Sequence, residues 1–155
     1  MMRYRGLDGE EHIYFYLKDD EHGWLSNFYP SPILIDGIKY SCVENYYQAQ
    51  KATEENLTNW IAQAPKPWFA MKAGRMLRRH EFQKDWEKMK VDVMRTGIRA
   101  KFTQNPVLKK KLLETEDLPL HENSPTDTYW GMKGKDMLGK VLMEIRKEVR
   151  ENGTD

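Results

Sequence analysis

The spacing of apolar residues changes once along this chain of 155 residues, near residue 41, and that change constrains the fold most strongly. Before it, residues 13–17 and two short runs at 33–35 and 38–40 are β-branched or aromatic, as is typical of strands. Asp36-Gly37 between the last two runs is the strongest short-range signal for a hairpin. After residue 41, apolar residues recur at helical spacing. The sequence therefore predicts a small N-terminal antiparallel sheet or hairpin followed by helices.

The helical part of the sequence divides into about five predicted helices. Ser41 lies three residues before Glu44, the spacing of a capping box, and Pro67 and Pro106 each suit the first turn of a helix. We expect the helices at about 42–55, 67–79, 84–102, 106–113 and 135–150. The last helix should bury one face, formed by Leu138, Val141, Leu142, Ile145 and Val149.

No repeat, linker or low-complexity tract interrupts these elements. The length suits one compact domain that buries enough surface to fold without a disulfide or a structural metal. We therefore predict a mostly helical α+β fold in a single domain over residues 1–155, with a core at about 13–150.

The composition limits the compartment and the class of partner. Cys42 is the only cysteine, so no intramolecular disulfide can form and a reducing compartment is expected. The sequence contains no run of about 20 apolar residues and no secretory signal at its start, which predicts a cytoplasmic protein with no membrane partner. Charged residues make up 32% of the chain but sum to only +1, and this balance does not favour a dedicated duplex-binding protein.

Several common chemistries lack their sequence signatures. The four histidines show no paired ligand spacing with cysteine, so we expect no metal site. The nucleophile elbow GxSxG and the dinucleotide motif GxGxxG are both absent, and Cys42 suits a small, partly buried residue in a first helical turn. We expect no cofactor.

Two segments in the first third of the chain combine polar and aromatic residues. Trp24, Ser26, Asn27 and Phe28 form either a turn whose polar side chains bond their own backbone, or a ligand site with aromatic stacking walls.

On the helix that follows the hairpin, Glu44, Tyr47, Gln48 and Lys51 lie at i, i+3, i+4 and i+7 and therefore share a face. This face either meets solvent or lines a pocket. Glu44 either closes the capping box or provides a catalytic carboxylate, and the two roles can coexist.

A third polar segment lies between the last two predicted helices. Glu122, Asp127 and Trp130 lie close together in it, and Gly131 to Lys135 leads into the final helix. Backbone N–H groups at a helix N-terminus beside lysines can bind phosphate. The alternative is a glycine-containing loop with solvated lysines.

These segments resemble the YbiA/NADAR family over about residues 13–150. The matching residues are, in chain order, Ser26-Asn27-Phe28, Asp36-Gly37, Cys42-Val43-Glu44, Gln48-Ala49-Gln50-Lys51, Ala73-Gly74-Arg75, Trp86, Met94-Arg95, Ala100-Lys101-Phe102, Glu122, Asp127, Tyr129-Trp130-Gly131, Gly134-Lys135, Leu138-Gly139 and Met143-Glu144. The chain departs from the family pattern at Asn45, where the family often has His, and in a shorter loop after Gly131.

The resemblance implies a hydrolase acting on N-glycosyl compounds. Similar proteins hydrolyse phosphoribosylamino-pyrimidine intermediates of riboflavin synthesis, and others act on ADP-ribose attached to nucleobases. The expected partner is thus a small ribosyl-phosphate or ADP-ribosyl substrate, with nucleic acid only as an ADP-ribosylated substrate. The alternatives are an ADP-ribosyl glycohydrolase and a non-catalytic sensor of ADP-ribose or a related nucleotide. The sequence leaves the oligomeric state open.

The site residues receive roles on this hypothesis. Glu44 stabilises the cationic transition state and accepts a proton from water, while Asp127 holds ribose hydroxyls or assists the water. The remaining candidates bind substrate. They are Trp24, Phe28 and Trp130 for the heterocycle, Ser26, Asn27, Tyr47, Gln48 and Gly131 for polar contacts, and Lys51, Arg75 and Lys135 for the 5′-phosphate.

Overall fold

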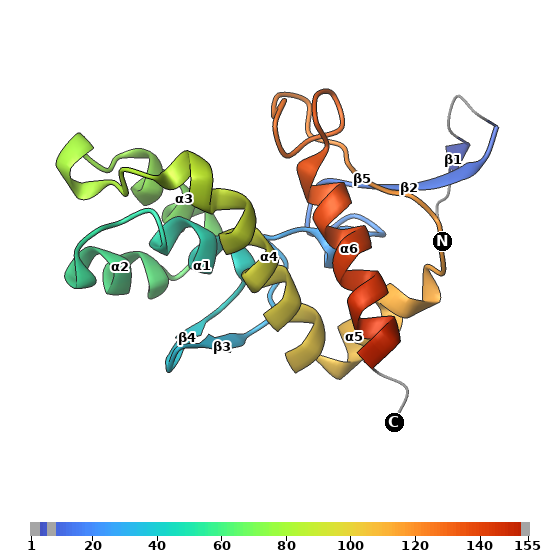
Figure 1. Ribbon diagram of the computed structural model, residues 1–155, viewed down its shortest axis with the longest axis horizontal. Coiled ribbons are helices and arrows are strands. Elements are labelled where there is room, and N and C mark those ends of the chain that lie inside the picture. Colours follow the sequence, from blue (N-terminus) through green and yellow to red (C-terminus); the bar gives the residue numbers. More distant parts are fainter. Residues whose placement is uncertain (1–3, 6–8, 153–155) are drawn as a thin grey trace. The chain divides into compact units, whose positions relative to one another are not determined.

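The computed structural model describes residues 4–5 and 9–152 (Figure 1). The remaining residues of the predicted domain, 1–3, 6–8 and 153–155, lie outside the described residues. Contacts divide the chain into two compact units: unit 1 comprises Met1–Tyr29 with Asn105–Asp155, and unit 2 comprises Pro30–Gln104.

Unit 2 begins with the predicted hairpin. Strands β3 (Ile33–Ile35) and β4 (Ile38–Tyr40) pair antiparallel, with Ile33 opposite Tyr40. The two turn residues have positive φ, 51° for Asp36 and 80° for Gly37, as a two-residue hairpin turn requires. The hairpin prediction is therefore confirmed.

Four helices form the rest of unit 2: α1 (Val43–Ala49), α2 (Glu55–Ala62), α3 (Pro67–Arg75) and α4 (Trp86–Gln104). Helix α1 packs against each of the other three (Figure 1). As a result all seven residues of α1 are buried, both the polar stripe and the stripe on the other side.

The expected single helix at 42–55 is wrong, because tertiary hydrogen bonds interrupt it after α1. The N–H of Thr53 donates to the carbonyl of Glu81, the N–H of Gln83 donates to the carbonyl of Lys51, and Ala52 forms an isolated bridge with Phe82. These bonds replace the helical ones, and the chain restarts as α2, which the sequence analysis missed.

The capping-box prediction is also wrong. The residue that precedes α1 is Cys42 rather than Ser41, and within the described part of the chain no side-chain hydrogen bond caps this helix. The predicted extension of α3 to residue 79 fails as well, because α3 ends at Arg75 and a separate 3₁₀ turn, η2 (Arg79–Glu81), follows.

Unit 1 contains a three-stranded sheet in the order β1 (Tyr4–Arg5), β2 (Glu11–Phe15), β5 (Leu120–Glu122). The β1–β2 pair is antiparallel, whereas β2 and β5 are parallel, with Ile13 opposite Leu120. The sequence did not predict β5, which has only three residues and follows a helix. Its pairing with β2 anchors the polar loop that begins at its end.

Two helices and a 3₁₀ turn complete unit 1: η1 (Gly23–Leu25), α5 (Pro106–Glu114) and α6 (Met137–Asn152). Helix α6 packs against β5 and α5. The face of α6 predicted to be buried is confirmed, since Leu138, Val141, Leu142, Ile145 and Val149 are all in the core.

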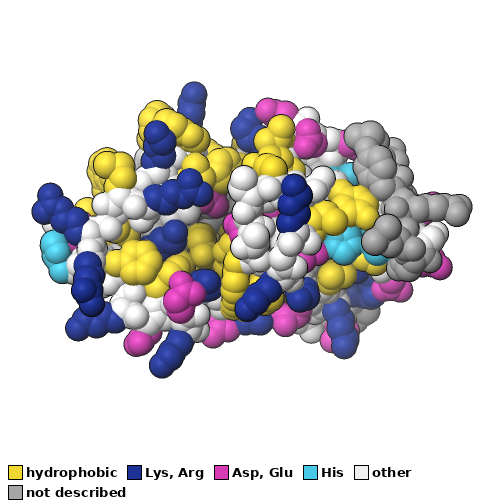
Figure 2. Space-filling view, turned by 90° about the horizontal axis from the view of Figure 1, so that it is seen from above, with side chains coloured by type: hydrophobic (Ala, Val, Ile, Leu, Met, Phe, Trp, Pro, Cys, Tyr) yellow, Lys and Arg dark blue, Asp and Glu magenta, His cyan; other side chains and the backbone are white. Residues whose placement is uncertain are grey.

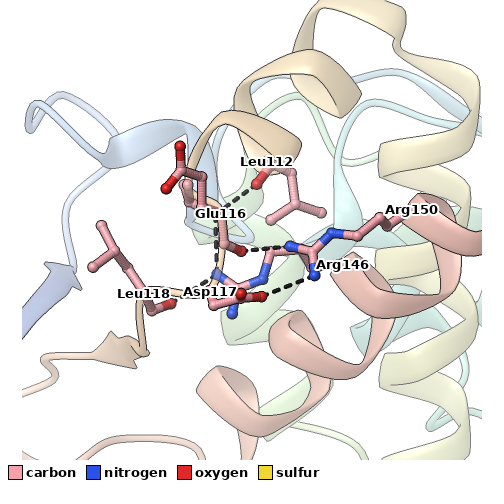
Figure 3. Close-up of polar contacts among 7 residues, drawn as sticks. Leu112, Glu116, Asp117, Leu118, Arg146 and Arg150 are labelled. Atoms are coloured by element: carbon pink, nitrogen blue, oxygen red, sulfur yellow. Dashed lines mark hydrogen bonds and ion pairs between the residues drawn. The ribbon is translucent and has the colours of Figure 1, made fainter.

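Polar contacts join α6 to the end of α5 (Figure 3). The buried guanidinium of Arg146 donates from one nitrogen to the hydroxyl of Thr115 at 3.0 Å and to the carbonyl of Leu118 at 2.7 Å. Arg150 bonds the Asp117 carboxylate at 2.8 Å and the Glu116 carbonyl at 2.6 Å. These bonds fix the turn between α5 and β5, and hence where β5 starts.

The described residues form six α-helices, two 3₁₀ turns and five short strands. This architecture confirms the prediction of a mostly helical α+β fold with a small hairpin; the helix beyond the expected five is α2. None of the described helices is both long enough and apolar enough to cross a lipid bilayer.

Candidate active site

Helix α1 turns its polar stripe into the interior of unit 2. Glu44 is 8%, Tyr47 6% and Gln48 4% exposed, so the solvent-facing alternative for this stripe is wrong. The reason is that α2, α3 and α4 surround a helix of only two turns. Buried polar side chains need partners, because an unbonded polar group in the interior costs free energy.

Gln48 orients the carboxylate of Glu44. Its amide nitrogen donates to Glu44 Oε1 at 2.7 Å, whereas its Oε1 is buried and has no hydrogen-bond partner among the described residues. Gly74 of α3 makes room for this amide, since a Cβ atom at that position would lie 2.0 Å from Gln48 Oε1. The glycine in α3 is therefore needed for Gln48 to reach Glu44 as it does.

Lys51, just beyond α1, lies among aromatic rings and charges. Its ammonium is 5.3 Å from the ring centroid of Tyr47 and 5.9 Å from that of Trp86, a cation–π geometry. Burial lowers the pKa of Lys51; the Glu44 carboxylate opposes this shift, and Arg75 adds to it. Unit 2 thus brings together all five of its predicted site residues: Glu44, Tyr47, Gln48, Lys51 and Arg75.

Arg75 lies in a stretch of unit 2 with an excess of positive charge. Between Trp60 and His80 the sequence has no Asp or Glu, and its lysines and arginines are exposed: Lys66, Lys72, Arg75, Arg78 and Arg79. At the end of Figure 2 where Figure 1 shows α2 and α3, Lys and Arg side chains stand among hydrophobic ones. This local excess suits an anionic ligand, and the net charge of +1 concealed it.

Asn45, where the chain departs from the family pattern, has a structural role. Its amide nitrogen donates to the carbonyls of Ala62 at 3.3 Å and Ala64 at 3.0 Å, at the C-terminal end of α2. Its Oδ1 accepts a hydrogen bond from the buried thiol of Cys42 at 3.3 Å. Burial raises the pKa of this thiol, as expected for a packed cysteine rather than a nucleophile.

The aromatic turn of unit 1 is more buried than a stacking platform needs to be. Trp24, Ser26 and Asn27 are all less than a tenth exposed, and Phe28 is partly exposed. Ser26 Oγ accepts the N–H of Phe28 at 3.2 Å, a bond to the local backbone of the kind expected for such a turn. Phe28 is the more accessible of the two rings predicted here.

Asp127 shapes the loop that follows β5. Its Oδ1 accepts the backbone N–H groups of Tyr129 at 2.9 Å and Trp130 at 2.8 Å. This pair of bonds forms a local turn of the kind that Asp residues favour, and it presents Trp130 and Gly131. Asp127 therefore has a positioning role whatever else it does.

At the start of α6, several of the backbone N–H groups that could form the expected phosphate site donate within the loop. The N–H groups of Lys135, Met137 and Leu138 donate to the carbonyls of residues 128, 129 and 130, and those of Gly134 and Asp136 donate to the carbonyl of Gly131. These donors are already used within the loop. Lys135 can bind a phosphate only through its side chain. The ammonium group of that side chain lies 5.5 Å from the ring centroid of Tyr129.

Glu122 is a titratable residue of this loop for which the sequence indicated no role. It ends β5 and is partly buried, and its Oε2 accepts the N–H of Ser124 at 3.2 Å. Burial raises the pKa of Glu122 to about 7; the Ser124 hydrogen bond opposes this shift, and Asp127 and Asp136 add to it. The signal in the sequence was the density of carboxylates in one short loop, but the burial was not visible there.

A chain of hydrogen bonds holds the other end of this loop. Asp136 Oδ2 pairs with His121 Nδ1 at 2.6 Å, and His121 Nε2 lies 2.8 Å from His12 Nδ1. The other oxygen of Asp136 accepts the N–H of Glu122 at 3.2 Å. Within the part of the chain that the structure describes, no three His, Cys, Asp or Glu side chains group closely enough to hold a metal ion.

Comparison with known proteins gives consistent matches. The NADAR domain family model matches residues 14–150. N-glycosidase YbiA of Escherichia coli (strain K12) is 40% identical over 141 residues, which cover 88% of each chain. N-glycosidase Npun_R5314 of Nostoc punctiforme is 38% identical, covering 89% of this chain and 92% of that protein.

Two further matches extend the comparison. Riboflavin biosynthesis protein VVA0006 of Vibrio vulnificus is 38% identical over 147 residues, which make up 92% of this chain but only 40% of that longer protein. Among solved structures, the NMR structure of E. coli YbiA superposes with a TM-score of 0.84 at 38% identity, covering 92% of this chain and 87% of that chain.

Proposed function

The chain belongs to the NADAR domain family, and on that premise we propose that it is an N-glycosidase, which hydrolyses the C–N bond between a base-like amine and a phosphorylated ribose. The observation that carries the proposal is the buried Glu44 carboxylate, which Gln48 holds at 2.7 Å beside the charged group of Lys51. A buried polar helix face is costly to fold, and a site for a charged, polar substrate accounts for it.

Glu44 is the proposed catalytic carboxylate. Cleavage of a ribosyl C–N bond passes through an oxocarbenium-like state with positive charge at the anomeric carbon. A fixed carboxylate stabilises that charge without reorganising, and it can take a proton from the attacking water. The hydrogen bond from Gln48 holds Glu44 in one orientation, as this role requires.

Lys51 and Arg75 are the proposed phosphate ligands. Arg75 is exposed at the end of α3 and can bind a phosphate through two nitrogens. Arg75 lowers the pKa of Lys51, as expected of a neighbouring positive charge, and an anion between them would relieve this repulsion. Tyr47 lies below the Lys51 ammonium and Gln48 beside Glu44, so both are proposed to contact the ribose.

The proposed substrate-binding residues of unit 1 have separate roles. Trp130 and Phe28, with Trp24, are proposed to stack on the heterocycle, while Ser26, Asn27 and Gly131 contribute polar contacts. For Asp127, the proposed contact with ribose hydroxyls uses the oxygen that does not hold the turn. Lys135 is proposed to reach phosphate through its ammonium group.

The substrate that we propose first is a phosphoribosylamino-pyrimidine intermediate of riboflavin synthesis. Relatives from Vibrio vulnificus and Zea mays carry the name of riboflavin biosynthesis proteins, and the positive stretch around Arg75 suits a sugar phosphate. ADP-ribose on a nucleobase is the competing substrate. We also propose a single domain over residues 1–155 with a core at about 13–150, and a cytoplasmic location because the one cysteine is a buried thiol, which suits a reducing compartment.

The test is base release, followed by chromatography, from a phosphoribosylamino-pyrimidinone and from an ADP-ribosylated guanine. Wild type and Glu44→Gln are compared, with the exposed Glu54→Gln as the matched control in the same unit. Cleavage of one substrate that depends on Glu44 establishes the glycosidase and identifies its substrate. Binding of ADP-ribose without cleavage of either substrate would instead favour the sensor.

A further inference from the structure

We propose that the outward face of helix α3 binds anionic phospholipid headgroups and holds the protein reversibly at a membrane surface. This inference concerns unit 2 alone and does not depend on the proposed N-glycosidase function. The α3 face consists of five exposed side chains of the helix and its C-cap: Trp68, Phe69, Lys72, Arg75 and Met76. The expectation of no membrane partner rested on the lack of a spanning segment, which a contact at the membrane surface does not need.

Helix α3 reverses the usual arrangement of a surface helix, with small residues inside and large apolar residues outside. Its buried residues are Ala70 and Gly74, and a Cβ atom at Gly74 would overlap a side chain of α1. By contrast, Trp68 and Phe69 are each 46% exposed and Met76 is 78% exposed. A surface helix normally buries such side chains in the core. Their exposure together on one helix therefore indicates a surface that contacts something else.

The residues of the α3 face form one continuous arc on the helix. Successive residues of an α-helix differ by about 100°, so the five side chains span about 120° of its surface. Their order across this arc is Arg75, Trp68, Lys72, Met76, Phe69. The Lys72 ammonium lies 4.3 Å from the ring centroid of Trp68, and the rings of Trp68 and Phe69 are 5.1 Å apart at 75°. Two cations thus lie among three large apolar side chains.

The sequence on either side of α3 adds positive charge. Lys66 precedes the helix, Arg78 and Arg79 follow it, and all three are exposed. The stretch between Trp60 and His80 thus has five lysines and arginines and no Asp or Glu, and Figure 2 shows basic side chains among hydrophobic ones at this end. A cluster of roughly four to eight basic residues on an amphipathic helix is typical of binding to anionic lipids.

Other occupants fit the α3 face less well than a lipid surface does. A second copy of the chain would bring two positive faces together. Nucleic-acid bases stack on open rings, whereas Lys72 covers one side of the Trp68 ring and the most exposed apolar side chain, Met76, has no ring. Protein interfaces are depleted of lysine, yet Lys72 lies in the middle of the arc. At a bilayer surface, indole rings favour the headgroup level and lysine extends to the phosphates.

The experiment measures binding of the whole chain to lipid vesicles by flotation. One set of vesicles contains phosphatidylglycerol and phosphatidylcholine in equal parts, and the other contains phosphatidylcholine alone. Wild type should float with the anionic vesicles and not with the neutral ones. Added salt should release it, because salt screens the attraction between exposed charges.

Two variants test the two components of the α3 face. Lys72→Glu reverses a charge and should weaken binding about 20-fold, since each basic residue near an anionic surface contributes about fivefold. Trp68→Ser combined with Phe69→Ser should weaken binding by at least about 10-fold through lost apolar burial. All three side chains are exposed, so circular dichroism should show an unchanged fold. The matched control, Val107→Ser with Lys110→Glu on the exposed side of α5, should bind within about twofold of wild type.

Several results would overturn the inference. They are no binding of wild type to anionic vesicles, equal binding to neutral ones, and equal losses in the control and the α3 variants. Salt-sensitive binding of an oligothymidylate that Lys72→Glu weakens, without vesicle binding, would assign the face to nucleic acid instead. Arg75 stays unchanged in every variant because it is also a proposed phosphate ligand. Base release by the variants should therefore match wild type, and the vesicle result stands whether or not the chain proves to be an N-glycosidase.

Discussion

Glu44 of unit 2 and Glu122 of unit 1 are both partly or fully buried carboxyl groups, yet their surroundings have opposite charge. Glu44 accepts a hydrogen bond from Gln48 and interacts with the ammonium of Lys51. Glu122 interacts with the carboxylates of Asp127 and Asp136. The difference teaches that the environment sets the chemistry of a carboxyl group: a neighbouring cation favours its charged form, whereas burial among acids raises its pKa.

A glycine accompanies each of the two carboxyl groups. Gly74 leaves room for the amide that holds Glu44, whereas Gly131 leaves room first for the backbone carbonyl of Asp127 and then for the carboxyl of Glu122. In both cases the missing side chain permits a close contact rather than a backbone conformation. The comparison between the two regions therefore extends from charge to packing.

The largest expected effect is that of Glu44→Gln. Loss of the negative charge should lower the rate of base release by about 10²- to 10⁴-fold. The melting temperature should stay close to that of wild type, because the glutamine oxygen can still accept the Gln48 hydrogen bond. Chromatography measures the rate of base release and circular dichroism measures the melting temperature, with Glu54→Gln as the control. A folded variant with near-normal turnover would show that Glu44 is not the catalytic carboxylate.

The second prediction concerns stability and pH in Glu122→Gln. Because burial raises the pKa of Glu122 to about 7 from 4.5, the folded protein holds this proton more tightly than the unfolded chain does. The free energy of unfolding of wild type should therefore fall as the pH rises from about 4.5 to about 7, and the loss should persist above that range.

The free energy of unfolding of Glu122→Gln should not fall in this way, because a glutamine side chain does not titrate. Relative to wild type, the free energy of unfolding of the variant should rise by on the order of 1–3 kcal/mol between pH 4.5 and pH 8. Urea denaturation at the two pH values measures it, with Glu114→Gln as the matched control. If the free energies of unfolding of variant and wild type differ by the same amount at both pH values, the pKa of Glu122 is not raised by folding.

The third prediction separates the two roles of Asp127. Asp127→Asn keeps an oxygen for the N–H groups of Tyr129 and Trp130 but removes a carboxylate that acts on Glu122. The pKa of Glu122 should fall, seen as a shift to lower pH in the infrared titration of its carboxyl band. Asp127→Ala should in addition lose about 1 kcal/mol or more of stability, because two partly buried donors lose their acceptor. An unmoved titration in Asp127→Asn would exclude Asp127 from the electrostatics of Glu122.

The smallest expected effect is that of Gly74→Ala. The new methyl group would overlap Gln48 Oε1 and displace an amide at the end of a flexible side chain, so the bond to Glu44 should break. We expect about a 10-fold loss of rate with less than about 1 kcal/mol change in the free energy of unfolding, since alanine favours the helix. Ala73→Gly, with the opposite change in helix propensity, is the control and should affect stability rather than rate. Full activity in Gly74→Ala would show that Gln48 does not orient Glu44.

Local signals in the sequence predicted the elements that depend on local chemistry. Asp36-Gly37 specified the β3–β4 turn, Pro67 and Pro106 marked the first residues of α3 and α5, and the apolar face of α6 was identified residue by residue. The same local reasoning placed the N-cap of α1 one residue early, because a capping box is a short pattern that several residues can satisfy.

The residues of unit 2 that meet around Glu44 were predictable in identity but not in arrangement. Helical spacing put Glu44, Tyr47 and Gln48 on one face, yet whether that face was buried depended on how α2, α3 and α4 pack. The ring of Trp86 beside Lys51 comes from α4, a helix far along the chain. Spacing along one helix contains no information about its neighbours.

The sequence by itself determined the fold class, the hairpin, the buried face of α6 and the set of residues that could do chemistry. Only the tertiary structure decided where α1 ends, because residues 51–53 bond to residues 81–83, and that β5 exists, because it pairs with β2. It also decided the burial of Glu122, which raises its pKa. The physical reason is that desolvation and hydrogen bonding depend on groups distant in sequence, whereas turns and helical faces depend on residues a few positions apart.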